Sequence, residues 1–452
     1  MLRKSVAVVV VIVLIAINLR PPMAGIGPLF DQIQAATGIS NLIGSLLTTL
    51  PIALIGLGAA LGYRLRRSLG ERDGISLGVV FIAIAALLRG FWHSPAALLI
   101  TALLAGIGIA LVQVLMTSFA KRYFPRESSK VMAIYTTGIM AGAAAGAMLA
   151  TPFANLWGWS GSLAAWALPA FAALLFWPFV TRNLDELEKR PSTDILASER
   201  GKLLHLEEAW GNSTSDDTGD LLLELSAALP SGIRSRSESR RMNFAGNLRA
   251  WQLMLYFGIS TAAFTLVLAW LPPYYLELGK SEAFSGTMLG VLMLFEVASG
   301  FIVSASVHRF PDRRVPLWIA TALLAAGFVL LLTAPLSFAY LIVMCLGLGS
   351  GALFPLALIV ALDHLTNADE AGALSDFVQG GGYLFASLAP VIGGLVRDST
   401  SSLVIAWWVI LALVALMFAM TWLFSPTSYH RIEGAAGAPR RANKKRHNRR
   451  KR

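Results

Sequence analysis

Long apolar stretches alternate with short polar ones over most of the chain. A helix that crosses the apolar core of a bilayer needs about 20 mainly apolar residues, and the sequence holds twelve windows of that kind. They run near 6–30, 40–63, 74–92, 96–120, 130–154, 161–181, 249–275, 283–307, 315–334, 337–362, 372–396 and 402–424. The pattern predicts an all-α membrane protein with twelve transmembrane helices.

One long polar stretch divides the windows into two groups of six. It contains "GNSTSDDTGD" and "SGIRSRSESRR", whose composition cannot bury a core of its own. We therefore expect an N-terminal six-helix bundle at 1–182, a largely disordered cytoplasmic linker at 183–247, a C-terminal six-helix bundle at 248–425 and a basic cytoplasmic tail at 426–452.

Lysine and arginine residues gather in alternate connections between the windows. Of the 37 basic residues, only Arg89, Lys280 and Arg397 fall in the opposite loops, and Arg20 lies within the first window. Because cytoplasmic loops carry the excess of basic residues, both termini are predicted to be cytoplasmic in a multi-pass protein of the cell inner membrane. The tail ends in "RRANKKRHNRRKR" without interleaved aromatic residues, so we expect it to face anionic lipid and not nucleic acid.

The composition excludes several other classes of protein. The chain is 56% hydrophobic and 14% charged, whereas soluble domains carry about 25% charged residues. Cys345 is the single cysteine and the six histidines are far apart, so no disulfide, metal site or cofactor is predicted. The sequence has no G-x-x-x-x-G-K-[ST] phosphate loop, and we expect neither an enzyme nor an ATP-driven pump.

The two groups of windows echo one another. The first window carries Arg20-Pro21-Pro22 near its outer end, and the seventh carries Leu271-Pro272-Pro273 at a comparable place. The fourth window contains "AGIGIAL", and the tenth contains "LGLGSGAL". Two pseudo-symmetric bundles are the simplest interpretation, and transporters built from such repeats bind their solute at the seam.

Several short motifs carry a resemblance to a known family. They are "NLRPPMAGIGPL" in the first window, "KRYFP" after the fourth, "AWQLMLYFGI" and "LAWLPP" in the seventh, and "ALSDFVQGGGYL" in the eleventh. With these motifs the chain resembles the major facilitator superfamily, and within it the branch of cyanate and nitroimidazole permeases. The resemblance implies a secondary transporter whose two halves rock around a central cavity.

Two further candidates lie near the ends of the windows. Trp270, in "LAWLPP", is a candidate for solute contact, and Arg67, in the loop after the second window, is a candidate for gating. That loop departs from the family pattern, because Arg66 stands where an acidic residue usually follows the small residues. An ionic gating lock at this place is therefore in question.

A charged residue interrupts the first apolar window. At about 1.5 Å per residue, Arg20 lies roughly 21 Å from the cytoplasmic face of a core about 30 Å thick. Pro21 and Pro22 have no amide hydrogen, so the helix must kink or open and free carbonyl groups near Ile17 and Asn18. Arg20 and Asn18 are predicted to bind a small planar anion, with the two prolines as a gating element. The alternatives are a structural ion pair and snorkelling to the outer interface.

Glu296 is the predicted partner of Arg20. It falls about eleven residues into the eighth window, close to the membrane centre at about 1.5 Å per residue. A carboxyl group at that depth is typical of proton coupling. The alternative is that a pair of Arg20 with Glu296 pins the two halves together.

Further polar residues face the predicted bundle interior. In the eleventh window Asp376, Gln379 and Tyr383 share one helical face, with Asp376 assigned to a cytoplasmic gate and the two deeper residues to the solute. The glycines at 380–382 allow close helix packing or a gating bend. In the fifth window Gly138, Gly142 and Gly146 of "GIMAGAAAG" stand four residues apart, a spacing that predicts close packing of two helices. The other candidates for solute contact are Gln113, Tyr135, Gln252 and Tyr256.

We therefore expect a proton-coupled secondary active transporter that moves a small anionic or polar heteroaromatic solute by alternating access. It would act as a monomer in the lipid bilayer, without a cofactor or a metal. One alternative is an exporter of weakly basic drugs, in which Glu296 binds the cation and Arg20 is structural. Another is a membrane sensor without transport activity that signals through the linker at 183–247.

Overall fold

The computed structural model describes residues 2–124, 127–188, 244–365 and 368–429, and every regular element in these ranges is a helix. Of the described residues, those up to 178 and those from 244 to 429 belong to one compact unit. The predictions for the linker at 189–243 and for the tail from 430 onward lie outside the described residues.

The helices follow the predicted windows in chain order. The first half contains α1 (Leu2–Ile17), α2 (Pro21–Ala24), η1 (Gly27–Leu29), α3 (Phe30–Thr37), α4 (Asn41–Leu69), α5 (Glu71–Arg89), α6 (Pro95–Tyr123), α7 (Ser128–Met148), α8 (Ala150–Ala164) and α9 (Ala167–Glu188). The second half contains η2 (Phe244–Gly246), α12 (Leu248–Glu277), α13 (Glu282–Ser306), η3 (Val307–Arg309), α14 (Arg314–Thr333), α15 (Ala339–Leu362), α16 (Ala368–Ala386), α17 (Leu388–Thr400), α18 (Val404–Met420), η4 (Thr421–Phe424) and η5 (Pro426–Ser428).

Within the described ranges, nine helical segments are long and apolar enough to cross a membrane, and the bent pair α8 and α9 makes a tenth. The two remaining predicted windows are also helical: α5 covers the third, and α16 and α17 cover the eleventh. All twelve predicted windows are thus helical, although some are interrupted.

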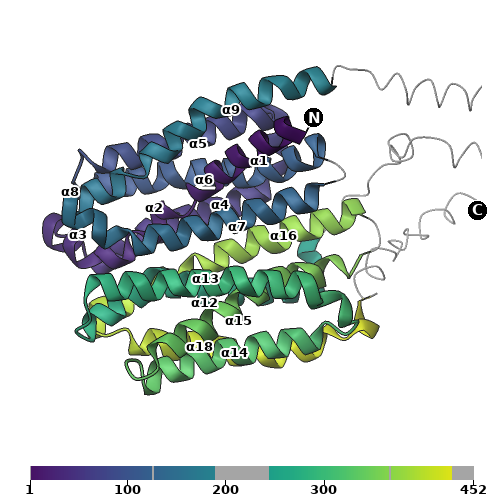
Figure 1. Cartoon of the computed structure of the whole chain (residues 1–452). Helices are drawn as coiled ribbons and strands as arrows, with labels where there is room; N and C mark the ends of the chain where they lie inside the picture. The colour runs from purple at the N-terminus through teal and green to yellow at the C-terminus, as the bar shows by residue number, and fades with distance from the viewer. Residues whose placement is uncertain (1, 125–126, 189–243, 366–367, 430–452) are drawn as a thin grey trace, which may run out of the picture. The chain divides into compact units, whose positions relative to one another are not determined.

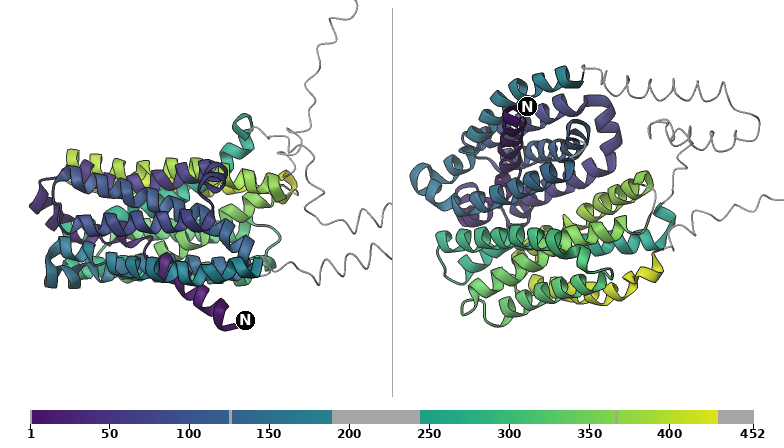
Figure 2. Two further views of the ribbon diagram at one scale, coloured as in Figure 1. Left: turned by 90° about the horizontal axis from the view of Figure 1, so that it is seen from above. Right: turned by 45° about the vertical axis from the view of Figure 1, so that its right-hand side comes forward.

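Each half packs mainly on itself. In the first half α6 packs against α4 and α5, and in the second half α15 packs against α13 and α14. Figure 1 shows the purple-to-blue helices of the first half gathered together and the green-to-yellow helices of the second half beside them, and the right-hand view of Figure 2 shows the same grouping. We call the end with the α3–α4, α12–α13 and α17–α18 junctions the far end, at the left of Figure 1, and the other the linker end.

The predicted break in the first span is confirmed. Helix α1 stops at Ile17, and α2 begins at Pro21 with a proline at each of its first two positions. Between them the chain makes a tight turn, in which the N–H groups of Asn18 and Leu19 donate to the carbonyls of Ile15 and Ala16 at 3.1 Å. The break follows from the missing amide hydrogens of the proline pair.

The matching proline pair of the seventh span does not break its helix. Pro272 and Pro273 lie inside the continuous helix α12, which ends at Glu277. The two prolines leave the carbonyls of Leu268 and Ala269 without helical N–H partners, and the helix continues past them for little more than one turn. The two halves therefore differ at this place, although the residues echo one another.

Three other spans are interrupted where the sequence predicted continuous helices. The fifth window is divided at Leu149 between α7 and α8, and the sixth is divided at residues 165–166 between α8 and α9. Gly158, with a left-handed φ of 74°, makes the turn in the predicted connection between these two windows. The eleventh window is divided at Ser387 into α16 and α17.

Glycines allow helices to approach closely at two important places. Gly138, Gly142 and Gly146 of α7 lie against Ala16, the Ile17 carbonyl and Pro21, respectively. The predicted packing role of this glycine series is confirmed, because a side chain at any of the three positions would collide with α1 or α2.

The glycines at 380–382 pack in the same way. Gly380 faces Ala60 and Gly56 of α4, whereas Gly381 and Gly382 face Met254 and Phe257 of α12. These contacts favour close packing over a gating bend, since α16 lies directly between α4 and α12.

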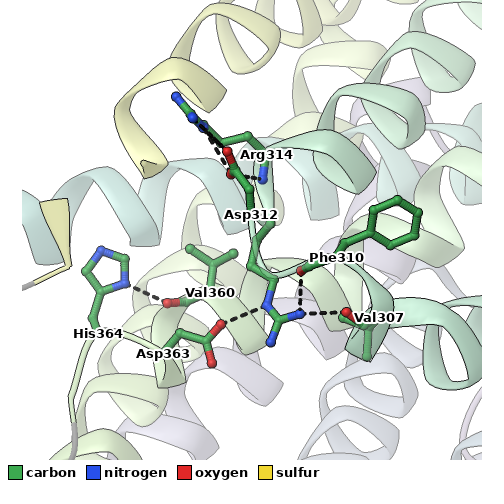
Figure 3. A network of polar contacts seen from close by, with 8 residues as sticks. Val307, Phe310, Asp312, Arg314, Val360, Asp363 and His364 are labelled. Atoms are coloured by element: carbon green, nitrogen blue, oxygen red, sulfur yellow. Dashed lines mark hydrogen bonds and ion pairs between the residues drawn. The ribbon is translucent and has the colours of Figure 1, made fainter. Parts of the chain in front are cut away.

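A network of hydrogen bonds and ion pairs lies at the linker end of the second half (Figure 3). Arg313 donates to the carboxylate of Asp363 at 2.9 Å and to the carbonyls of Val307 and Phe310 at 2.6 and 2.8 Å. Beside it, hydrogen bonds from Arg314 hold the pKa of Asp312 below its usual value. The network fixes the short connection between α13 and α14 against the end of α15.

Candidate functional site

Arg20 lies in the break between α1 and α2, and its side chain is buried, with a relative exposure of 6%. Its guanidinium carbon lies 5.6 Å from the ring centroid of Phe264 in α12. The Nε atom has no hydrogen-bond partner, and among the described residues no carboxylate lies within ion-pair distance of Arg20. The break therefore presents a buried cation whose hydrogen-bonding capacity is not fully used.

The charge of Arg20 acts on three side chains from three other helices. They are the hydroxyl groups of Tyr135 in α7 and Tyr383 in α16, and the carboxyl group of Glu296 in α13. The Tyr135 hydroxyl is buried without a partner, and the Tyr383 ring packs edge-on against Phe257, with centroids 5.5 Å apart. The structure thus brings four predicted site residues from both halves into one cluster.

Glu296 is held by a residue that the sequence reasoning missed. Its Oε1 atom accepts a hydrogen bond of 2.7 Å from the hydroxyl of Ser350 in α15, and its Oε2 atom has no partner. The backbone at Glu296 also lies against Gly351, where a side chain would collide. The predicted direct ion pair with Arg20 is therefore not formed, because α15 supplies the partner. The available signal was the small polar residue in "GLGSG" of the tenth window.

A narrow apolar hollow lies beside this cluster, inside the second half. It shares Phe264 with the Arg20 contact and Ser350 with the Glu296 hydrogen bond. Its lining is Ala263, Phe264, Val267, Leu292, Leu324, Leu346 and Ser350. In this conformation the hollow is too narrow to admit a water molecule, so it offers no space for a solute.

The chemistry of the cluster combines hydrogen-bond donors with an acceptor. Arg20 Nε and the Tyr135 hydroxyl can donate, and Glu296 Oε2 can accept. A buried polar atom without a partner costs about 1–3 kcal/mol, so a molecule that satisfied these atoms would be bound favourably. Within the described residues, no group of three or more metal-ligating side chains occurs.

Asn18 and Gln113 are the other candidates of the first half. The Asn18 amide donates to the Leu14 carbonyl at 2.6 Å, and its Oδ1 atom is buried without a partner. Asn18 is therefore available for one acceptor interaction next to Arg20. Gln113 is half-buried on α6.

Two candidates of the second half form hydrogen bonds with residues outside the cluster around Arg20. Tyr256 contacts the hydroxyls of Thr321 and Thr421 at 3.3 and 3.2 Å. Trp270 donates to the Pro390 carbonyl at 2.8 Å. The structure does not bring these two side chains to Arg20.

The two glutamines of the second half are engaged locally. Gln252 accepts a hydrogen bond of 3.2 Å from Arg249, and Gln379 donates to Ser375 at 3.1 Å. Gln379 lies one turn from Tyr383 on α16, whereas Gln252 lies near the linker end of α12.

The gating candidates occupy two different places. Asp376 is exposed on α16, where the charges of Arg66 and Lys121 act on it across the two halves. Arg67 is exposed at the end of α4, whereas Pro21 and Pro22 are buried in the break beside Arg20. Arg66, and not Arg67, is the basic residue of this loop whose charge acts on Asp376.

Arg89 is the largest departure from the sequence reasoning. It was expected in an outer loop, but it lies in the last turn of α5 with a relative exposure of 2%. The sequence misleads here because a basic residue at the edge of an apolar window is typical of a loop.

Comparisons with known proteins agree with this architecture. The model of the family described as Major Facilitator Superfamily matches residues 7–390. The cyanate transport protein CynX of Escherichia coli (strain K12) is 32% identical over 426 residues, which are 93% of this chain and 98% of that protein. The 2-nitroimidazole transporter of the same organism is 26% identical over 423 residues, 93% of this chain and 95% of that protein.

Solved structures show the same fold. A D-xylose-proton symporter has a TM-score of 0.66 at 15% identity, covering 95% of this chain and 99% of that chain. A POT family transporter in complex with 5-aminolevulinic acid has a TM-score of 0.67 at 15% identity, covering 93% and 96%. At this identity the likeness concerns the fold alone, and it confirms the predicted class of twelve helices in two pseudo-symmetric bundles.

Proposed function

Because the chain belongs to the major facilitator superfamily and is a multi-pass membrane transporter, we propose that it moves a small anionic or polar heteroaromatic solute by alternating access. Two relatives are named for cyanate and for 2-nitroimidazole. One is a small anion and the other a polar aromatic ring, and both offer acceptors to a guanidinium group.

The observation that carries this proposal is the state of Arg20. A buried charge in a membrane protein normally has a partner, and a guanidinium presents donors in a planar fork suited to anions. Here the described residues supply an aromatic ring at 5.6 Å and no carboxylate at ion-pair distance. An anionic or electron-rich solute would supply the missing acceptors, and Phe264 would supply a face for stacking.

Proton coupling is proposed to pass through Glu296. The positive charge of Arg20 acts on this buried carboxyl group. An anion bound at Arg20 would cancel that charge and leave the buried carboxylate less well stabilised. Glu296 would then take up a proton, so that solute and proton move together.

The remaining parts of the proposal concern placement. We propose a monomer in the cell inner membrane with both termini cytoplasmic, two bundles at 1–182 and 248–425, a cytoplasmic linker at 183–247 and a basic tail at 426–452. The distribution of basic residues supports this orientation.

The test is uptake of labelled cyanate and of 2-nitroimidazole by proteoliposomes, with and without an inward proton gradient. We expect Arg20→Lys to raise the KM for the transported solute at least tenfold, and Glu296→Gln to abolish the response to the gradient. Arg249→Lys is a matched control for Arg20, because Arg249 is also buried against a phenylalanine ring, 5.0 Å from the centroid of Phe424. The exposed Glu277→Gln controls for Glu296.

Unchanged uptake and unchanged pH response in both site variants would contradict the assignment. If Glu296→Gln instead abolished efflux of weakly basic drugs while Arg20→Lys lowered only the protein yield, the chain would be a drug exporter.

A further inference from the structure

Arg89 is one of the largest fully buried side chains of the protein. Its Nη1 atom donates to the carbonyl oxygen of Pro22 at 2.8 Å, and its Nε atom donates to the hydroxyl of Thr101 at 3.2 Å. Its Nη2 atom has no partner, and no carboxylate among the described residues lies within ion-pair distance. A second buried guanidinium is thus directed at the break in the first span.

The carbonyl of Pro22 is free to accept this bond because α2 is so short. In a continuing helix the N–H of Ile26 would close on Pro22, but here it donates to the Met23 carbonyl at 3.3 Å. Arg89 therefore satisfies a carbonyl that the broken helix leaves open. Helix α5 and the break are joined by this contact.

Helix α2 in turn carries Arg20. The N–H groups of Met23 and Ala24 both donate to the Arg20 carbonyl, at 3.0 and 2.9 Å. The carbonyl of Arg20 is thus the first hydrogen-bond acceptor of α2. Fixing the position of α2 therefore also fixes the backbone of Arg20. On its other side α2 rests on α7, where Gly146 lies against Pro21.

The burial of Arg89 needs a reason, because a buried cation without a counter-ion is costly and an apolar side chain of similar volume would pack at lower cost. Only the guanidinium group supplies directed hydrogen-bond donors that reach from α5 to Pro22. We propose that Arg89 is a positioning residue, which fixes α2 and thereby the place of the Arg20 guanidinium in the solute site. This inference rests on the proposed role of Arg20 in binding the solute.

The test compares KM and maximal rate of cyanate uptake in proteoliposomes that contain the full chain. Arg89→Met removes every donor while keeping the volume, and we expect KM to rise at least fivefold with a thermal unfolding midpoint equal to or above that of the wild type. Arg89→Lys keeps one charged donor and is expected to restore part of the affinity. Thr101→Val removes the second contact but leaves the bond to Pro22, so its KM is expected to stay within twofold.

A double-mutant cycle separates positioning from a general structural role. If Arg89 acts through Arg20, Arg89→Met adds little to KM in an Arg20→Lys background, because the affected interaction is already lost. Fully additive effects, or an Arg89→Met variant with unchanged KM, would overturn the proposal while leaving the role of Arg20 intact. An Arg20→Lys variant with unchanged KM would overturn both.

If Arg89→Met does not fold, Arg89→Gln takes its place, because the shorter neutral side chain loses the reach to Pro22. The double-mutant cycle of Arg89→Gln with Arg20→Lys then decides between a positioning role and a general structural role.

Discussion

The carboxylate of Asp398 in α17 caps the first turn of α4, a helix of the other half. It accepts hydrogen bonds from the backbone N–H groups of Asn41 and Leu42 at 3.1 and 2.9 Å, and from the Asn41 amide at 2.7 Å. A carboxylate is favoured at a helix N-terminus because the first N–H groups have no intrahelical acceptor and carry partial positive charge. The two halves are therefore latched at the far end.

Other contacts reinforce this closure. Gln32 donates to Glu282 at 2.7 Å, and Arg397 lies 3.9 Å from the Asp31 carboxylate and 5.6 Å from the ring centroid of Phe30. These contacts between halves must all break if the far end opens during transport.

The first prediction concerns the Asp398 cap. Loss of a capping side chain costs about 1 kcal/mol, so Asp398→Ala is expected to shift the equilibrium towards an open far end by roughly fivefold. The measurement is the rate at which a water-soluble maleimide labels Ser45→Cys in a Cys345→Ala background, since Ser45 lies under the contact of Gly394 with α4. Asp312→Asn, at the linker end, is expected to leave the rate unchanged, and equal rates in the Asp398 variant would refute the latch.

The second prediction concerns the ring below Arg20. A cation over an aromatic face gains about 0.5–2 kcal/mol, and Phe264 is the aromatic partner of Arg20. Phe264→Leu is expected to raise the KM for cyanate uptake by about fivefold with little change in the unfolding midpoint. Phe424→Leu removes the equivalent ring below Arg249 and serves as the control. A greater rise of KM in the control variant would contradict the site.

The third prediction concerns packing of α7 on the broken span. A side chain at Gly142 would overlap the Ile17 carbonyl, and overpacking of this kind costs about 1–3 kcal/mol. We expect Gly142→Ala to lower the thermal unfolding midpoint in detergent and the folded yield. Gly300→Ala in α13 is the matched control, because nothing lies within 4 Å of its added methyl group. Similar midpoints for the two variants would show that α1 and α7 adjust freely.

The fourth prediction concerns His364 at the linker end. Burial and, to a smaller extent, the charge of Arg249 lower the pKa of His364 to about 4, against the opposing effects of a hydrogen bond to the Val360 carbonyl and of the charge of Asp363. Arg249 donates from Nε to His364 Nε2 at 3.0 Å, so the neutral ring is the form that fits.

The sign of the pH effect follows from these values. An unfolded histidine has a pKa of about 6.5, so the folded chain binds fewer protons than the unfolded chain between about pH 6.5 and 4. The contribution of His364 to stability is complete above about pH 6.5 and is lost as the pH falls towards 4. The unfolding midpoint of the wild type is expected to fall more steeply between pH 7 and 5 than that of His364→Gln. The exposed His308→Gln is expected to follow the wild type.

Local chemistry accounts for what could be predicted without coordinates. The length of each apolar stretch predicted the twelve helices, the missing amide hydrogens of Pro21 and Pro22 predicted the break, and the spacing of glycines in "GIMAGAAAG" predicted a packed face. Each of these depends only on neighbours along the chain. The site assignments themselves stay predictions, although Tyr135, Tyr383 and Glu296 all lie within electrostatic range of Arg20.

The pairing of side chains between helices was decided by the tertiary structure. Glu296 bonds to Ser350 and not to Arg20, Tyr256 turns towards Thr321, and Arg89 reaches the Pro22 carbonyl. The sequence by itself determined which segments are helices and where a charge interrupts them, because those properties follow from hydrophobicity and backbone chemistry. Which helix faces which charge depends on the rotation and axial register of packed helices, and these are set only by the contacts of the folded protein.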